Sequence, residues 1–226
     1  MIKISAPDAR VFGFGYIQCV KSSVRILGID PGLRITGYGC IDVDDSGESL
    51  VEGGVFRLGR GKTEDAKVAD VKTISARLAE LDTDLRELIG RLKPEVVAVE
   101  QLFAHPKHPA TSIIMGHARG VILLAVRRAG LELIEIRPNE IKKSLTGFGH
   151  AKKGQMQAAV QAYFNLEEPP RPPDVADAIA IALCAANKRK WGMSTGGSAS
   201  TKRTGGRGLR DLPSEVREQV RRSLED

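Results

Sequence analysis

The sequence is poor in aromatic residues and cysteine, and it has no long apolar run. Phe, Trp and Tyr make up 4% of its 226 residues, so a core must be built mainly from Val, Ile, Leu and Ala. No apolar stretch approaches the roughly 18 residues of a membrane-spanning helix. Residues 1–24 are too polar for a signal peptide. The cysteines (Cys19, Cys40 and Cys184) form no C-x-x-C pair, which argues against a zinc ribbon or a disulfide scaffold and favours a cytoplasmic location.

The formal net charge of +6 suggests an anionic partner such as nucleic acid, but this charge is unevenly placed. Residues 1–24 and 188–226 carry net charges of +2 and +5, which leaves −1 for residues 25–187. Within that central part, basic residues gather in two runs, Lys107–Arg128 and Arg137–Lys153. If the two runs share a face, they form a local anion-binding surface. Any one of these side chains is equally well explained as an ordinary solvated residue.

Hydrophobic periodicity and turn residues predict an α/β fold. The order of elements predicts a mixed five-stranded sheet, with three antiparallel meander strands plus parallel strands, flanked by helices. The predicted strands are 24–30, 34–43, 49–58, 95–99 and 131–136, and the predicted helices are 64–91, 111–128, 138–145, 152–164 and 174–188.

The length fits one domain with appendages. We expect residues 1–24 to form a poorly ordered extension and residues 25–190 to form the domain. The Gly-, Ser- and Arg-rich segment 191–226 should be a basic, largely disordered tail, with a short helix at 213–224.

Carboxylates occur at positions where core elements begin or end. Asp30 and Glu100 each end a predicted buried strand, and Asp174 and Asp177 lie three residues apart at the start of the last helix, so they share a face. Any one of them could be a turn former or a helix cap. If the two strands are neighbours, however, the acids converge, and a cluster of like charges needs a cation. Carboxylate oxygens suit Mg²⁺ or Mn²⁺, and two such ions would support phosphodiester hydrolysis.

Four segments resemble the RuvC family of bacterial Holliday-junction resolvases, which has an RNase H-like fold. These are R-I-L-G-I-D-P-G (25–32), V-A-V-E-Q-L-F (97–103), R-P-N-E-I-K-K-S-L-T-G-F-G (137–149) and P-P-D-V-A-D-A-I-A-I-A (172–182). G-I-D-P-G alone is a weak signal, but all four segments in this order and spacing are specific. The resemblance covers about Arg25–Lys188, so residues 1–24 and the basic tail lie outside it.

The resemblance implies a metal-dependent endonuclease that cuts two opposed strands of a four-way DNA junction and leaves 5′-phosphate and 3′-hydroxyl ends. It implies two Mg²⁺ ions per site, with Mn²⁺ as a substitute, held by the tetrad Asp30, Glu100, Asp174 and Asp177. Asp30 would bridge the two ions, and Asp174 would ligate one ion or orient the attacking water.

The resemblance also implies partners and DNA contacts. It places the interface of a homodimer on helix 111–128 and suggests the RuvA–RuvB branch-migration complex as a partner. Phe103 would insert near the junction centre, although it could instead be a core residue. Lys142 and Lys153 match lysines that contact DNA near the scissile phosphate, and neighbouring basic residues complete the expected DNA-binding set: Lys152, His150, Lys143 and Lys107.

Other readings remain open. The chain could be another RNase H-like nuclease that acts on RNA–DNA hybrids or single strands, an ATPase-type relative, or a DNA-binding module without activity. Gly61-Lys62-Thr63 resembles the end of a Walker A loop, but Phe56 stands where the pattern needs glycine, and no G-x-G-x-x-G follows a strand, so we expect no nucleotide cofactor. His105-x-x-His108 is interrupted by Pro106, which makes a zinc site improbable.

Overall fold

The computed structural model describes residues 2–3, 23–59, 71–102, 109–147, 149 and 151–194. The expected helix at 213–224 and the first residues of the expected helix at 64–91 lie outside these ranges. Among the described residues, no helix has the length and apolarity to span a bilayer.

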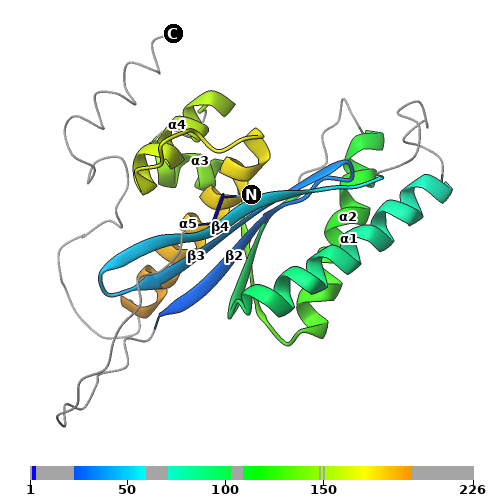
Figure 1. Cartoon of the computed structure of the whole chain (residues 1–226), viewed down its shortest axis with the longest axis horizontal. Coiled ribbons are helices and arrows are strands. Elements are labelled where there is room, and N and C mark those ends of the chain that lie inside the picture. Colours follow the sequence, from blue (N-terminus) through cyan, green and yellow to red (C-terminus); the bar gives the residue numbers. More distant parts are fainter. Residues whose placement is uncertain are drawn as a thin grey trace.

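A mixed sheet forms the centre of the fold (Figure 1). Its strand order is β1-β4-β3-β2-β5-β6, in which β2, β3 and β4 form an antiparallel meander and β5 and β6 run parallel to β2. The strands are β1 (Ile2–Lys3), β2 (Val24–Asp30), β3 (Ile35–Asp44), β4 (Gly47–Arg57), β5 (Val96–Glu100) and β6 (Glu132–Ile136). The five predicted strands and their mixed pairing are therefore confirmed.

The sheet has one strand that the sequence did not predict. Ile2 and Lys3, which lie in the extension expected to be poorly ordered, pair with Gly53 and Glu52 at the edge of β4. Two residues are too few for a periodic pattern, and the open edge of β4 supplies the backbone partners that form this strand.

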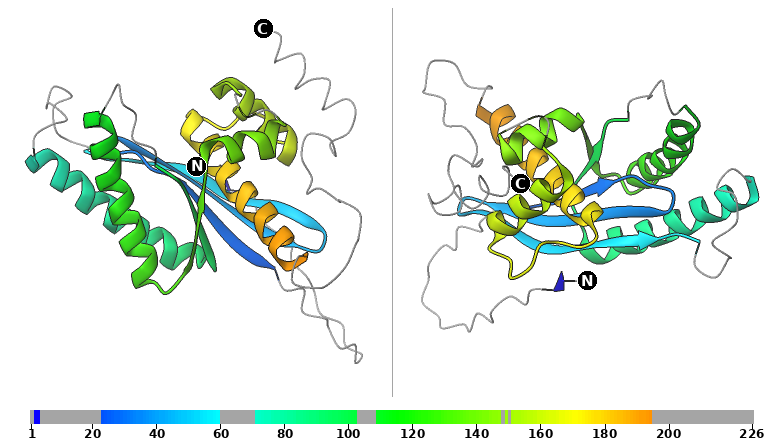
Figure 2. Two further views of the ribbon diagram at one scale, coloured as in Figure 1. Left: turned by 180° about the vertical axis from the view of Figure 1, so that it is seen from behind. Right: turned by 90° about the horizontal axis from the view of Figure 1, so that it is seen from above.

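Helices cover both faces of the sheet, with α1 and α2 on one face and α3, α4 and α5 on the other (Figure 2). Leu81, Leu85, Leu88 and Leu92 bury one side of α1, whose last turn precedes Pro94. Pro138 opens α3, and Gly147 ends it in the left-handed conformation with φ 79°. The helices are α1 (Val71–Leu92), α2 (Pro109–Arg128), α3 (Pro138–Thr146), α4 (Lys153–Phe164) and α5 (Pro173–Ser194).

The last helix is longer than predicted. It continues past residue 188 to Ser194, beyond the expected end of the domain at 190. Lys188 forms an ion pair with Glu140 of α3, and Arg189 forms one with Glu132 of β6. These contacts tie α5 to α3 and β6 at residues 188 and 189, where the sequence prediction ended the helix.

Alternate side chains of the central strands enter two separate cores. On β2, Ile26 packs with α3, α4 and α5, while Leu27 and Ile29 pack with α1 and α2. On β5, Ala98 belongs to the first core and Val97 to the second. Both faces of these strands are thus covered, and their carboxyl ends are left as the accessible edge of the sheet.

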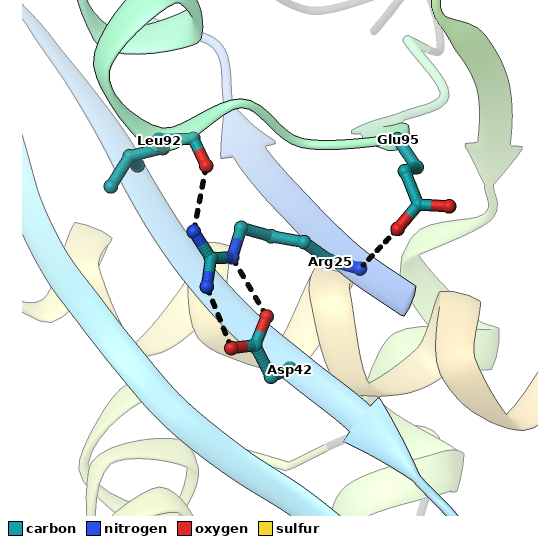
Figure 3. A network of polar contacts seen from close by, with 4 residues as sticks. All are labelled: Arg25, Asp42, Leu92 and Glu95. Atoms are coloured by element: carbon teal, nitrogen blue, oxygen red, sulfur yellow. Dashed lines mark hydrogen bonds and ion pairs between the residues drawn. The ribbon is translucent and has the colours of Figure 1, made fainter. Parts of the chain in front are cut away.

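Two groups of polar contacts, made of ion pairs and hydrogen bonds, join the sheet to the C-terminal end of α1. Arg25 of β2 binds both carboxylate oxygens of Asp42 on β3, at 2.7 and 2.8 Å, and donates to the carbonyl of Leu92 (Figure 3). The buried Glu52 of β4 accepts from two nitrogens of Arg91. Burial and the Glu52 hydrogen bond raise the pKa of Tyr38 to about 12.

Candidate active site

Two carboxylates meet at the carboxyl edge of the sheet. The parallel strands β2 and β5 pair Ile29 with Val99, and the next residues are Asp30 and Glu100, the last residues of their strands. Because parallel neighbours end on the same side, the sheet brings together two acids that are 70 residues apart in the sequence. The pairing of β2 with β5 supplies the neighbour relation on which the convergence of these two acids depended.

The other two carboxylates, Asp174 and Asp177, come from the first two turns of α5, which packs directly on glycines of the sheet. Gly37 of β3 pairs with Asp30 of β2. A Cβ atom at Gly37 would lie 2.1 Å from the carbonyl oxygen of Asp174. A Cβ at Gly28 would lie 2.2 Å from the carbonyl oxygen of Ala178. The absence of side chains at these positions allows α5 to approach closely enough for Asp174 and Asp177 to reach the strand ends.

The turn after Asp30 is held by its own hydrogen bonds. The buried hydroxyl of Thr36 donates to the carbonyl of Gly32 at 2.6 Å and accepts from the Gly32 N–H at 3.3 Å. A Cβ at Gly32 would lie 2.1 Å from the Ile35 carbonyl, so only glycine fits this turn. The backbone next to Asp30 is therefore fixed from both sides.

The four carboxylates line one cavity of about 580 Å³. Lys142 of α3 and Lys152 and Lys153 at the start of α4 line the same cavity. Of the other expected DNA-binding residues, Lys143 follows Lys142 on α3 but does not line the cavity, and Phe103, Lys107 and His150 lie outside the described residues. Acidic groups thus share one hollow with basic groups suited to phosphate.

Three of the carboxyl groups that line this cavity have raised pKa values. Burial raises the pKa of Asp30 well above its ordinary range, and the charges of Glu100, Asp177 and Asp174 raise it further, while Lys153 opposes them. Burial, and then the Asp177 charge, raise the pKa of Glu100. Burial also raises the pKa of Asp177, against the effect of Lys153. A cluster in which several carboxylates raise one another's pKa is stabilised by a cation.

The residues around the cavity fit hard divalent cations. Every acidic donor is a carboxylate oxygen, the ligand type of Mg²⁺ and Mn²⁺, and the Cys40 and Cys184 thiols are buried in the two cores. Among the described residues, no three acidic, His or Cys side chains form a ready-made metal-binding group. The side chains would therefore have to draw together around an ion from backbone positions that the sheet and α5 already set.

Several residues that shape the site escaped the sequence analysis. Met115, Ile141 and Met156 form apolar parts of the cavity wall, and Thr36 and Gly37 act through the backbone. A usable signal existed for the glycine, because a glycine inside a strand pattern often marks close approach of another backbone. The apolar wall residues had no such signal, since their spacing matches any core-facing helix.

Helix α2 exposes an apolar stripe on the face of the sheet opposite to α5. Ile113 is 62% exposed and Leu124 is 48% exposed. Gly120 lies between them on the same side of the helix, and a Cβ there would meet no atom within 4 Å. This is the helix on which the sequence resemblance placed a dimer interface.

Comparisons with known proteins agree with this arrangement. The family model "Crossover junction endodeoxyribonuclease RuvC" matches residues 26–185. The chain is 45% identical over 166 residues to the protein of that name from Moorella thermoacetica, covering 74% of this chain and 93% of the relative. It is 41% identical over 169 residues to the one from Heliobacterium modesticaldum, covering 75% of this chain and 98% of the relative.

A solved structure extends the likeness to three dimensions. The structure of Thermus thermophilus RuvC in complex with a Holliday junction substrate is similar with a TM-score of 0.64 and 30% identity, over 75% of this chain and 96% of that one. The match to the family model, residues 26–185, starts after residue 25 and ends before the last turns of α5, close to the extent of about 25–188 that the sequence motifs indicated.

Proposed function

The chain belongs to the RuvC family of crossover junction endodeoxyribonucleases, and we propose that it resolves Holliday junctions in DNA recombination and repair. It would cut two opposed phosphodiester bonds of a four-way junction and leave 5′-phosphate and 3′-hydroxyl ends. The observation that carries this proposal is the single cavity that four carboxylates share with three lysines. This combination pairs a cation site with a phosphate site.

Each side chain of the cavity has a role in this chemistry. Asp30, Glu100, Asp174 and Asp177 would hold two Mg²⁺ ions, with Mn²⁺ as a substitute; Asp174 either ligates an ion or orients the attacking water. When bound, such ions would supply a hydroxide nucleophile and stabilise the charge on the leaving oxygen. Asp30 would help to hold both ions, because it ends β2 beside Glu100 of β5 and close to the N-terminal part of α5.

The lysines of the cavity would hold the scissile phosphate. Lys142 of α3 and Lys153 of α4 line the cavity with the carboxylates, and their charges oppose the rise that burial causes in the pKa of Asp177. A phosphate that enters the cavity would therefore meet cations there. Lys152 joins them, and we propose further DNA contacts at Phe103, Lys107, Lys143 and His150.

A second copy of the chain would bind along α2. The exposed side chains of Ile113 and Leu124 flank the open surface at Gly120, which lets another helix approach closely. In a two-fold dimer the two cavities stand at a fixed separation, so a junction presents one strand to each site.

The nuclease domain would extend over residues 25–190, and the branch-migration complex RuvA–RuvB would be its partner in the cytoplasm. In this view neither the N-terminal extension nor the basic tail is required for specific cutting. A truncated protein of residues 25–190 that fails to cut junctions at low salt would contradict this division.

The test is cleavage of a synthetic four-way junction with and without Mg²⁺, beside a linear duplex, a single strand and an RNA–DNA hybrid. We expect paired cuts in the junction alone. Asp30→Asn should bind the junction and leave it intact, whereas Asp82→Asn on the surface of α1 should cut normally. Preferential cleavage of the hybrid or the single strand would favour another RNase H-like nuclease, and wild-type cutting by Asp30→Asn would reject the assigned site.

A further inference from the structure

Arg119 of α2 links the ends of two strands at the edge of the cavity. Its Nε donates to the backbone carbonyl of Glu100 at 3.4 Å, and its Nη2 forms an ion pair with Glu135 of β6. The Arg119 side chain is only 17% exposed. Beside this contact, the Gln101 N–H donates to the carbonyl of Ile136 at 2.7 Å and extends the β5–β6 ladder.

The same part of α2 packs against the site at two further points. Met115, one turn before Arg119, lines the cavity. The backbone at Gly116 lies close to the residues after Glu100, since a Cβ there would be 3.7 Å from Cδ2 of Leu102. Helix α2 therefore lies close to the end of β5 at Glu100 and at Leu102, and lines the cavity through Met115.

The contact with Arg119 acts on the backbone of Glu100 and not on its charge. Burial and the charge of Asp177 raise the pKa of Glu100, and the charge of Lys142 lowers it. The positive charge of Arg119 is balanced by Glu135. Its guanidinium therefore binds the peptide group and leaves the carboxylate available.

We infer that Arg119 is a positioning residue for the metal-dependent cleavage, because it fixes the peptide group of Glu100 between β6 and α2. The inference rests on the proposed function. It explains how Glu100 keeps its place at the point where β5 ends. The carboxylates must still draw together around an ion. A displacement of the Glu100 backbone would therefore displace its carboxylate from the position in which it binds the ion. Misplacement of a reacting group by about 1 Å can cost roughly 10²-fold in rate.

An arginine suits this position better than a lysine. The planar guanidinium carries donors that can point to a carbonyl and a carboxylate at the same time, whereas an ammonium is a single point charge. Arg119→Lys keeps the charge and removes the two-point link. Glu135→Gln keeps Arg119 and weakens only the anchor on β6.

The test compares Arg119→Lys, Arg119→Ala and Glu135→Gln with Glu132→Gln, which removes the partner of Arg189 at the other end of β6. Four quantities are measured: Tm, Mn²⁺ affinity by calorimetry, junction affinity in EDTA, and single-turnover cleavage over a Mg²⁺ titration. We expect both Arg119 variants to lower maximal cleavage about 10- to 100-fold, weaken Mn²⁺ binding and raise the Mg²⁺ midpoint, with junction affinity within about twofold of wild type. Glu135→Gln should show a smaller change of the same kind, and Glu132→Gln none.

The inference is overturned if Arg119→Lys binds Mn²⁺ and cuts as the wild type does, or if Glu132→Gln weakens Mn²⁺ binding equally. A loss of Tm with unchanged Mn²⁺ affinity in Arg119→Lys also overturns it, because the role would then be structural. If the wild type cuts no junction but the Arg119 variants still bind Mn²⁺ more weakly, the proposed function fails and the positioning role stands.

Discussion

At the scale of single residues, the carboxylates of the cavity are held in place against their own repulsion. Asp30 is the clearest case, because burial and three neighbouring acids all raise its pKa. A carboxyl group whose pKa is raised on folding destabilises the folded chain once it ionises. Without a cation, the metal-binding cluster is therefore a source of instability.

Asp30→Asn should stabilise the metal-free protein at neutral pH. The folded wild type keeps its proton above the ordinary pKa of 3.8, so its stability falls as pH rises through the window between that value and the raised folded pKa. The variant has no such group, and the gain in Tm over wild type should therefore be absent near pH 3 and grow toward pH 7. A gain of a few degrees is expected, since about 1 kcal/mol shifts the Tm of a domain of this size by roughly 2–4 °C.

The measurement is thermal melting in EDTA across this pH range for Asp30→Asn, with Asp82→Asn, a partly exposed carboxylate of α1, as the control. Added Mg²⁺ should raise the Tm of the wild type more than that of Asp30→Asn, because binding to the folded state stabilises it. A wild type that melts at the higher temperature in EDTA at pH 7 would contradict the cause given for the raised pKa.

The buried ion pair of Glu52 gives a second prediction at this scale. The Glu52 side chain is 4% exposed and binds two nitrogens of Arg91. Arg91→Leu would leave a buried carboxylate without its cation, and we expect a loss of about 3 kcal/mol in the free energy of unfolding. Arg86→Leu, which removes an exposed partner of Asp82 on the same helix, should cost less than about 1 kcal/mol. Urea unfolding of both variants at pH 7 measures the difference, and equal losses would contradict it.

At the scale of elements, the packing of α5 on the sheet determines where two of the four carboxylates lie. Gly37→Ala would place a Cβ 2.1 Å from the Asp174 carbonyl, so the first turn of the helix must shift. We expect cleavage to fall by about 10²-fold or more, because a 1 Å displacement of a reacting group has roughly that effect. Overpacking of this kind should also cost about 1–3 kcal/mol of stability.

The matched control is Gly90→Ala on the exposed side of α1, where a Cβ meets no atom within 4 Å. This change should raise stability by about 1 kcal/mol, as expected for alanine in place of glycine within a helix, and leave cleavage unchanged. Single-turnover cleavage and urea unfolding of the two variants decide the matter. Wild-type cleavage by Gly37→Ala would show that the contact is easily relieved.

Elements with a clear local pattern could be predicted from the sequence, and contacts between elements could not. The strands that end at Asp30 and Glu100 show apolar residues before an acid, so their extent followed from the sequence, whereas their convergence depended on the pairing of β2 with β5. The short strand β1, the hydrogen bonds of Thr36 and the link from Arg119 to Glu100 depend on partners elsewhere in the chain. No spacing within one segment indicates such partners.

At the scale of the whole molecule, the sheet separates two tasks. Helices α3, α4 and α5 lie on the face that builds the cavity, and α1 and α2 lie on the face with the exposed stripe of Ile113 and Leu124 (Figure 2). Arg119 and Met115 of α2 reach the cavity at the strand ends. Helix α2 would therefore connect the surface proposed for assembly with the cavity proposed for cleavage at this edge of the sheet.

Leu124→Glu should break the proposed dimer and uncouple the two cuts. A charge within the apolar stripe would have to be buried against the partner, whereas Val71→Glu changes an apolar residue that is 76% exposed at the start of α1. Analytical ultracentrifugation should find Leu124→Glu monomeric and Val71→Glu dimeric. On a cruciform plasmid, Leu124→Glu should yield nicked circles where Val71→Glu yields linear molecules. Linear products from a monomeric Leu124→Glu would show that paired cutting does not require this surface.

The position of α5 late in the chain also determines when, during synthesis, the protein could first cleave DNA. A nascent chain that has been synthesised as far as Pro170 already contains all strands of the described sheet, but only two of the four carboxylates. Asp174 and Asp177 leave the ribosome later, and they reach the strand ends only when their helix settles on Gly28 and Gly37. On the proposed chemistry, a chain that stops before Asp174 therefore cannot cut, and the capacity to cut arises only once α5 has packed on the sheet.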